Sequence, residues 1–241
     1  MSKISPVDLC DKFNQAYVEK WGYIYGKTHE QWTEQKQKAV ESDPDGIEQT
    51  KQYGRKWIGH WVTDCSGLFA WSFNELGGYI YHGSNSIWNK YTSSKGKLVK
   101  GKKENGEDLK IATAVFKTSG TDRYHIGLYI GNGKVIEAKG VAYGVVISKI
   151  EEWHEWAELA GVNYSSIEPG NVTKVPEGYA AVKGGKLRLR QDASTSSKVL
   201  DTADTGDQVE VIPETSEWTH VKFKGKTGYM MSAFLTKGGE K

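Results

Sequence analysis

The chain has 241 residues, a formal net charge of +2 and two cysteines, Cys10 and Cys65. Its 32 basic and 30 acidic side chains nearly balance, so no strong electrostatic field attracts the chain to nucleic acid or to a membrane. Two cysteines are too few for a disulfide framework. No apolar run has transmembrane length, and the N-terminus has no apolar signal-peptide core. We therefore expect a protein made in the cytoplasm, unless a signal peptide was removed.

The first 60 residues predict short helices. The Ser-Pro pair at residues 5–6 is typical of a helix start, and Cys10 lies on the apolar face of the helix that follows. Residues 21–26 (WGYIYG) break that helix as a short strand or loop. The polar stretch 27–56 predicts two short helices around the turn at 43–46 (DPDG). This stretch is interpreted either as solvated surface or as a flap bordering a cleft.

Cys65 stands directly before an apolar run with helical spacing, within residues 63–71 (TDCSGLFAW). Thr63 or Asp64 is a suitable N-cap, and the glycine pair at 77–78 ends the helix. The positive end of a helix dipole stabilises a thiolate, so we expect the pKa of Cys65 to fall. Cys65 is therefore a candidate nucleophile; the alternative is a small buried core residue.

The segment after this helix mixes aromatic and polar residues at 79–88 and is expected to wall a substrate groove. Residues 95–110 predict a surface hairpin rich in Lys, Gly and Glu. Residues 111–117 alternate enough to predict a strand.

Residues 125–138 (HIGLYIGNGKVIEA) predict a β-hairpin around Gly-Asn-Gly. Matching the apolar faces of the two strands places Gly127 opposite Glu137. His125 and Glu137 then become diagonal neighbours on one face, within side-chain reach, because successive strand residues alternate between faces. A register slip of one residue would turn Glu137 away. The alternatives are a solvated or core histidine and an exposed glutamate.

From residue 145 onward the sequence predicts a strand and a helix, then a linker, and then a series of short strands. Residues 145–147 predict a strand and residues 151–160 a helix carrying Trp153 and Trp156. A stretch rich in Pro, Gly and polar residues at 165–180 predicts a linker. Short strands separated by turns then predict a small barrel over 181–241, with strands at 187–190, 199–200, 209–212, 219–223 and 227–230. This barrel contains one histidine and no cysteine, which favours binding over catalysis.

Three motifs, in order, resemble the NlpC/P60 family of cysteine peptidases, which cut bacterial cell-wall peptides. In chain order they are YIYG at residues 23–26, TDCSGL around Cys65 and the HIGLYIGNG hairpin that begins at His125. Residues 187–190 (LRLR) through 225–230 (GKTGYM) resemble bacterial SH3 (SH3b) wall-binding domains. The resemblance implies an α+β fold: a papain-like catalytic domain over 1–164, a linker over 165–180 and an all-β SH3b barrel over 181–241.

The resemblance also implies site residues. Cys65 corresponds to the nucleophile, His125 to its base, and Glu137 to the third polar residue, where the family often has His, Asn or Gln. Tyr23, Asp64 and Ser66 match positions that border substrate, with Asp64 and Ser66 placed to hold the free amine of an N-terminal L-Ala.

Two further departures accompany Glu137. The interval from Tyr23 to Cys65 is longer than is usual for the family, which bears on the groove and on the bond that is cut. Arg188 stands where an SH3b domain usually has Asn, which bears on ligand preference.

The implied activity is a peptidoglycan hydrolase: a cysteine endopeptidase that cuts the stem peptide, with the γ-D-Glu–diamino acid bond expected, through a thioester. One alternative is an N-acetylmuramoyl-L-alanine amidase on the same scaffold; another is a non-catalytic wall-binding protein, favoured by the departure at Glu137. A metal site using His125 and Glu137 lacks supporting ligand spacing, so no cofactor is expected. The partner expected is bacterial peptidoglycan. A lytic domain followed by SH3b, without a signal peptide, resembles phage or prophage endolysins. A secreted autolysin trimmed of its signal would look the same.

Overall fold

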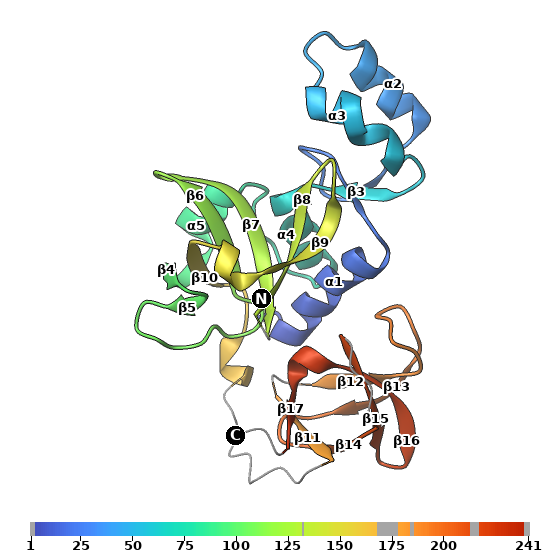
Figure 1. Ribbon diagram of the computed structural model, residues 1–241, viewed down its shortest axis with the longest axis vertical. Helices are drawn as coiled ribbons and strands as arrows, with labels where there is room; N and C mark the ends of the chain where they lie inside the picture. Colours follow the sequence, from blue (N-terminus) through green and yellow to red (C-terminus); the bar gives the residue numbers. More distant parts are fainter. Residues whose placement is uncertain (1–2, 132, 168–177, 184–185, 213–216, 239–241) are drawn as a thin grey trace.

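The computed structural model describes residues 3–131, 133–167, 178–183, 186–212 and 217–238 (Figure 1). Within them, strands form one large sheet from residues 92–159 and a second from residues 179–237. Helices α1 (Pro6–Val18), α4 (Cys65–Glu75) and α5 (Ser84–Lys90) pack against the first sheet. Among the described residues of the second sheet's own segment, the short 3-10 helix η4 (Ser232–Phe234) stands between strands (Figure 1). No described helix has the length and apolar character needed to cross a membrane.

Helix α1 (Pro6–Val18) begins where the Ser-Pro pair predicts. Ser5 occupies the N-cap position in an extended conformation, although its side chain makes no capping hydrogen bond. Cys10 and Phe13 are fully buried on its inner face, as predicted for Cys10. This helix packs beneath the strands that carry the candidate site.

The stretch after α1 forms a small sheet with a helical insertion. β1 (Gly22–Tyr23) pairs in parallel with β3 (Trp61–Thr63), and β2 (Glu30–Gln31) pairs with the other edge of β3. Between β2 and β3 lie α2 (Glu34–Ser42), α3 (Glu48–Tyr53) and the 3-10 helix η1 (Gly54–Trp57). The prediction of two short helices is confirmed.

The amide of Gln37, fully buried, ties this insertion together. It accepts a hydrogen bond from Trp32 Nε1 (2.9 Å) and donates to the carbonyl oxygen of Thr50 on α3 (3.2 Å). The two helices project from one end of the molecule (Figure 1).

Two helices and the first sheet follow. The helices are α4 (Cys65–Glu75) and α5 (Ser84–Lys90). The sheet order among the described residues is β5-β4-β10-β6-β7-β8-β9. The strand bounds are β4 (Thr92–Val99), β5 (Lys102–Lys103), β6 (Ala114–Ser119), β7 (Asp122–Gly131), β8 (Lys134–Gly140), β9 (Gly144–Lys149) and β10 (Glu155–Leu159).

Strand β10 corrects the helix predicted over 151–160. Only a short 3-10 turn, η2 (Ile150–Glu152), precedes it. Trp156 pairs with Gly96 of β4 on one side and Val115 of β6 on the other, so β10 lies inside the sheet. The spacing of Trp153, Trp156 and Leu159 suggested a helix, but strand pairing on both edges overrides such a local preference.

The second sheet forms the predicted small β module. Its order in the described segments is β13-β12-β16-β15-β14-β11-β17. Its strands and short helix are β11 (Tyr179–Val182), β12 (Leu187–Arg190), β13 (Val199–Ala203), β14 (Gln208–Val211), β15 (Trp218–Phe223), β16 (Lys226–Met231), η4 (Ser232–Phe234) and β17 (Leu235–Lys237). Of the predicted linker, residues 165–167 belong to the 3-10 helix η3 (Tyr164–Ile167), and 168–177 lie outside the described residues.

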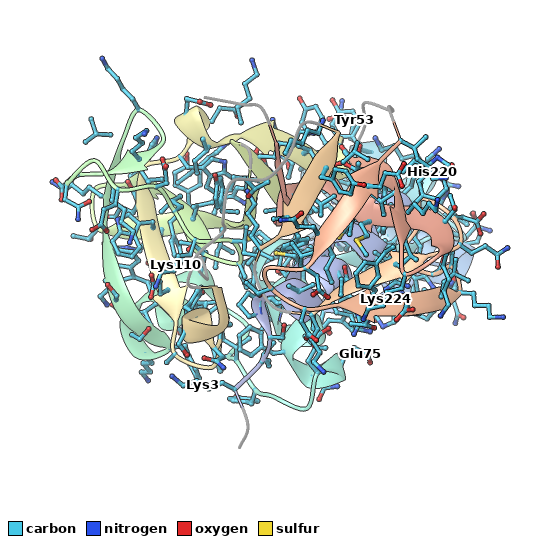
Figure 2. The ribbon with its side chains drawn as sticks, turned by 90° about the horizontal axis from the view of Figure 1, so that it is seen from below. Lys3, Tyr53, Glu75, Lys110, His220 and Lys224 are labelled. Carbon is cyan, nitrogen blue, oxygen red and sulfur yellow. The ribbon has the colours of Figure 1, made fainter. Side chains whose placement is uncertain are left out.

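The second sheet contacts α1 through ion pairs. Arg188 donates to Asp8 and to Asp11, each at 2.6 Å, and Arg190 donates to Asp11 at 3.2 Å. Asp11 is buried, with 7% of its surface exposed. Arg188, the departure noted at the start of the β module, therefore faces α1 in this structure. Figure 2 shows the molecule from below, with Lys110 on the side of the first sheet and Lys224 on that of the second.

Candidate active site

Cys65 is the first residue of α4, directly after β3. The preceding residue, Asp64, is the N-cap, and its carboxylate accepts a hydrogen bond from the Gly67 N–H at 2.7 Å. This cap fixes the direction in which the helix starts. The backbone N–H of Ile126 on β7 lies close enough to the Cys65 thiol to lower its pKa, so the thiol faces the residue that follows His125.

Burial raises the pKa of the Cys65 thiol to about 12, and the carboxylate of Asp64 adds to the rise. Backbone N–H groups of Ile126, Ser66 and Cys65 act in the opposite direction but do not outweigh burial. The prediction of a lowered pKa is therefore wrong, because it counted the helix start and left out desolvation. The resting group is a neutral thiol, and forming a thiolate requires a base.

His125 and Glu137 meet across the β7–β8 hairpin. Leu128 pairs with Ile136 and Tyr129 with Val135, which places Gly127 opposite Glu137. Nε2 of His125 lies 2.6 Å from Oε2 of Glu137. The predicted register and proximity are confirmed.

Both members of this pair are buried: 8% of His125 and none of Glu137 is exposed. Burial alone would raise the pKa of Glu137, but hydrogen bonding from His125 and from Ser148, together with the charge of His125, outweighs it and lowers the pKa. Glu137 is therefore a carboxylate at neutral pH. Its charge favours a proton on Nε2 and leaves Nδ1 as the ring nitrogen for exchange with another group.

Trp153 covers the ring of His125, a contact that the sequence did not predict. The two rings stack with centroids 5.5 Å apart and planes 18° from parallel. The indole Nε1 of Trp153 donates to Ser148 Oγ at 3.3 Å. A Cβ atom at Gly127 would stand 2.7 Å from the Trp153 ring, so the glycine makes room for this indole. In the sequence, Gly127 indicates that space is left beside His125 on this face of the strand. It does not indicate which side chain fills that space.

Tyr23 and Ser66 also lie at the start of α4. Tyr23 pairs with Thr63 across β1 and β3. Burial, followed by the charges of Cys65 and Asp64, raises the pKa of Tyr23, so its phenol remains a hydrogen-bond donor. Ser66 donates to Asp64 Oδ1 at 3.2 Å. The structure thus brings Tyr23, Asp64 and Ser66 around Cys65, while their contact with a substrate stays a prediction.

His82 is a further residue that the sequence did not single out as a site residue. Its Nε2 lies 2.8 Å from Oδ2 and 2.9 Å from Oδ1 of Asp64. The hydrogen bond to Asp64 raises the pKa of His82 and outweighs the effect of its partial burial. Asp64 therefore has a basic partner contributed by the loop before α5.

The insertion borders a hollow beside Tyr25. A pocket of about 390 Å³ lies between this segment and α2 and α3. Its lining includes Ile24, Tyr25, Trp32, Val40, Ile47 and Thr50. Most side chains of residues 27–56 are exposed or half-buried, which agrees with the interpretation as solvated surface. The interpretation as a flap bordering a cleft stays a prediction, because this hollow is lined mainly by the insertion itself.

Residues 49–162 match the model of the NlpC/P60 family, and residues 185–236 match the model of the bacterial SH3 domain. The chain thus contains an NlpC/P60 domain followed by a bacterial SH3 domain, within an α+β fold, as the resemblance implied. Tyr23 lies before the matched range, whereas Cys65, His125 and Glu137 lie inside it. A comparison with curated proteins found no match.

Several solved structures are similar to this chain. The NlpC/p60 domain of the peptidoglycan hydrolase SagA is 16% identical, with a TM-score of 0.40 over 64% of this chain and 99% of that one. The P60 domain of an antigen from M. avium subspecies paratuberculosis is 17% identical, with a TM-score of 0.40 over 65% and 97%. The peptidoglycan hydrolase RipB from Mycobacterium tuberculosis is 18% identical, with a TM-score of 0.38 over 65% and 66%.

Proposed function

We propose that this chain is a peptidoglycan hydrolase that cuts stem peptides with Cys65 as nucleophile, His125 as base and Glu137 as the residue that orients the base. The observation that carries the proposal is the buried His125–Glu137 pair, whose Nε2 and Oε2 atoms are 2.6 Å apart. His125 lies on β7 directly before Ile126, whose backbone N–H acts on the Cys65 thiol. A thiol, an imidazole and a carboxylate so connected are the parts required for acyl transfer through a covalent intermediate.

In the first step, His125 takes the proton of Cys65 while the sulfur attacks the carbonyl carbon of the scissile amide. The raised pKa of Cys65 makes this proton transfer necessary, since little thiolate exists at rest. Glu137 stabilises the imidazolium that forms. The N–H group of Cys65, at the start of α4, stabilises the oxyanion in this scheme.

In the second step, the carbon–nitrogen bond breaks, and the imidazolium of His125 protonates the leaving amine. Water then attacks the thioester and gives up a proton to His125, which releases the acid product and restores the thiol. No metal is used in this scheme.

The proposed bond is that between γ-D-Glu and the diamino acid of the stem peptide. The departure at Glu137 had favoured a non-catalytic wall binder, but a carboxylate that bonds to the histidine serves the orienting role. We propose the division of labour that the resemblance implied: catalysis by the domain over residues 1–164 and wall binding by the β module. The boundary expected at residue 181 moves, because Tyr179 and Ala180 of the expected linker 165–180 already pair within the second sheet as part of β11. The site of action would be the bacterial cell wall, where such an enzyme is lytic, as in endolysins.

Mass spectrometry of fragments released from purified peptidoglycan tests the choice of bond. Cleavage after γ-D-Glu creates a new amino terminus on the diamino acid and leaves L-Ala-D-Glu on the sugar. An N-acetylmuramoyl-L-alanine amidase would instead release whole peptides that begin with L-Ala. Fragments of the second kind would overturn the endopeptidase assignment.

A further inference from the structure

Asp64, next to the candidate nucleophile, is a carboxylate whose hydrogen-bonding capacity is already used. It is buried, with 4% of its surface exposed. Oδ1 accepts from the Gly67 N–H (2.7 Å) and from Ser66 Oγ (3.2 Å), and Oδ2 accepts from the Gly26 N–H (2.8 Å). His82 Nε2 reaches both oxygens. A carboxylate has about four lone-pair sites, so little capacity remains for another donor.

The negative charge of Asp64 also has a partner of opposite sign within the protein. The contact with His82 favours the imidazolium form, whose positive charge balances the carboxylate. A free ammonium group that approached Asp64 would have to displace His82 or lie beside a like charge. An acylated nitrogen is neutral and has no such requirement. This environment therefore favours a peptide whose amino end is blocked, in place of the free amine of L-Ala that the resemblance implied for Asp64 and Ser66.

His82 is also part of the wall of a pocket of about 500 Å³ that runs along α4. The pocket is within the size range of ligand sites. Two exposed aromatic side chains line it: 65% of Tyr79 and 50% of Tyr81 is exposed. Asn74 and Glu75 of α4 also line it.

The chemistry of this lining suits a sugar. Aromatic rings present apolar faces with polar edges, which match the mixed C–H and hydroxyl surface of a pyranose. Asn74 and Glu75 are exposed and supply a carbonyl, an amide and a carboxylate for hydroxyl and acetamido groups. Glu75, labelled in Figure 2, keeps an ion pair with Lys12 at 3.1 Å.

We propose that this pocket binds the amino end of the wall peptide while it is still joined to its amino sugar. The substrate class is then the acylated, glycan-linked stem peptide, and His82 selects against free peptides. This inference rests on the proposed function, because it takes the groove at Cys65 to hold a stem peptide.

Binding to the full chain carrying Cys65→Ala tests the proposal without relying on turnover. Three ligands with one peptide sequence are compared by calorimetry: a free amine, an N-acetyl amine and the peptide on its disaccharide. We expect the acetylated peptide to bind about 10-fold more tightly than the free amine, and the disaccharide form a further 10-fold more tightly. Equal or tighter binding of the free amine would overturn the selection by His82.

Variants assign the effect to this pocket and not to the SH3 domain. The double variant Tyr79→Ala/Tyr81→Ala should lose the gain from the disaccharide and leave the acetylated peptide unaffected. The matched control is Tyr143→Ala, which removes a ring 62% exposed in the turn between β8 and β9. His82→Gln keeps a neutral donor and should bring the free and acetylated peptides toward equal affinity. An unchanged disaccharide gain in the double variant would contradict the subsite.

The same ligands, mixed with the parent chain, separate this inference from the proposed function. Failure to cleave any of them, together with the binding order above, would sink the hydrolase assignment and keep the subsite. Cleavage of all three at equal kcat/KM, with equal binding, would do the reverse.

Discussion

Glu137 is a fully buried carboxylate whose Oε2 lies 2.6 Å from Nε2 of His125, so its proposed role depends on the negative charge. In Glu137→Gln an amide oxygen can still accept from Nε2 of His125, but the negative charge that stabilises imidazolium is gone. We expect kcat on peptidoglycan fragments to fall about 10²- to 10⁴-fold, with a far-UV circular dichroism spectrum like that of the parent. A kcat within about 3-fold of the parent would mean that the carboxylate has no part in the chemistry.

The Asp64–His82 pair predicts a pH dependence of stability. The pKa of His82 is raised in the folded chain above its ordinary value of 6.5. The pair therefore contributes stability that is fully present below pH 6.5 and is lost as pH rises through the raised pKa. We expect the gap in free energy of unfolding between the parent and His82→Gln to shrink between pH 5.5 and pH 9. Urea unfolding at a series of pH values measures it, and a gap that widens with pH would contradict the pairing.

At the scale of elements, the candidate site depends on a close fit between the β7–β8 hairpin and the segment before β10. Gly127→Ala places a Cβ 2.7 Å from both the Trp153 ring and a methyl carbon of Val135. We expect a loss of about 1–3 kcal/mol of stability and a lower kcat, because Trp153 must move off His125. Ser119→Ala, at an exposed position of β6, is the control for a change in this sheet. Parent-like stability and kcat in Gly127→Ala would show that the stacking has no role.

Elements with local signals could be predicted from the sequence. The Ser-Pro start of α1, the start of α4 at Cys65 and the register of the β7–β8 hairpin each depend on a few neighbouring residues. Each lies where predicted. Strand β10 could not be predicted, since its conformation comes from pairing with strands distant in sequence.

The same distinction applies to the site. The proximity of His125 and Glu137 followed from the register of one hairpin. The contacts of His82 and Trp153 join segments that no local pattern connects, and the raised pKa of Cys65 comes from burial by the whole domain. Desolvation cannot be read from a helix start alone.

At the scale of the whole molecule, Arg188 links the second sheet to α1 through Asp8 and Asp11. Arg188→Asn introduces the residue that the resemblance implied at this position, and it leaves Asp11 with Arg190 as its remaining ion-pair partner in the described segments. Because Asp11 is buried, we expect a loss of about 1–3 kcal/mol and faster proteolysis between the two sheets. Lys226→Ala, which breaks the exposed pair with Asp201, is the matched control. Identical unfolding and proteolysis of the two variants would argue against a docked SH3 domain.

The most direct measurement is the digestion of purified peptidoglycan by the parent and by Cys65→Ala at equal concentration. Solubilisation of the wall and the release of new amino groups are followed together, with unfolding curves to show that both chains are folded. The account predicts steady release by the parent and none above background by Cys65→Ala. If Cys65→Ala digests the wall as fast as the parent, Cys65 is not the nucleophile and the proposed mechanism is wrong.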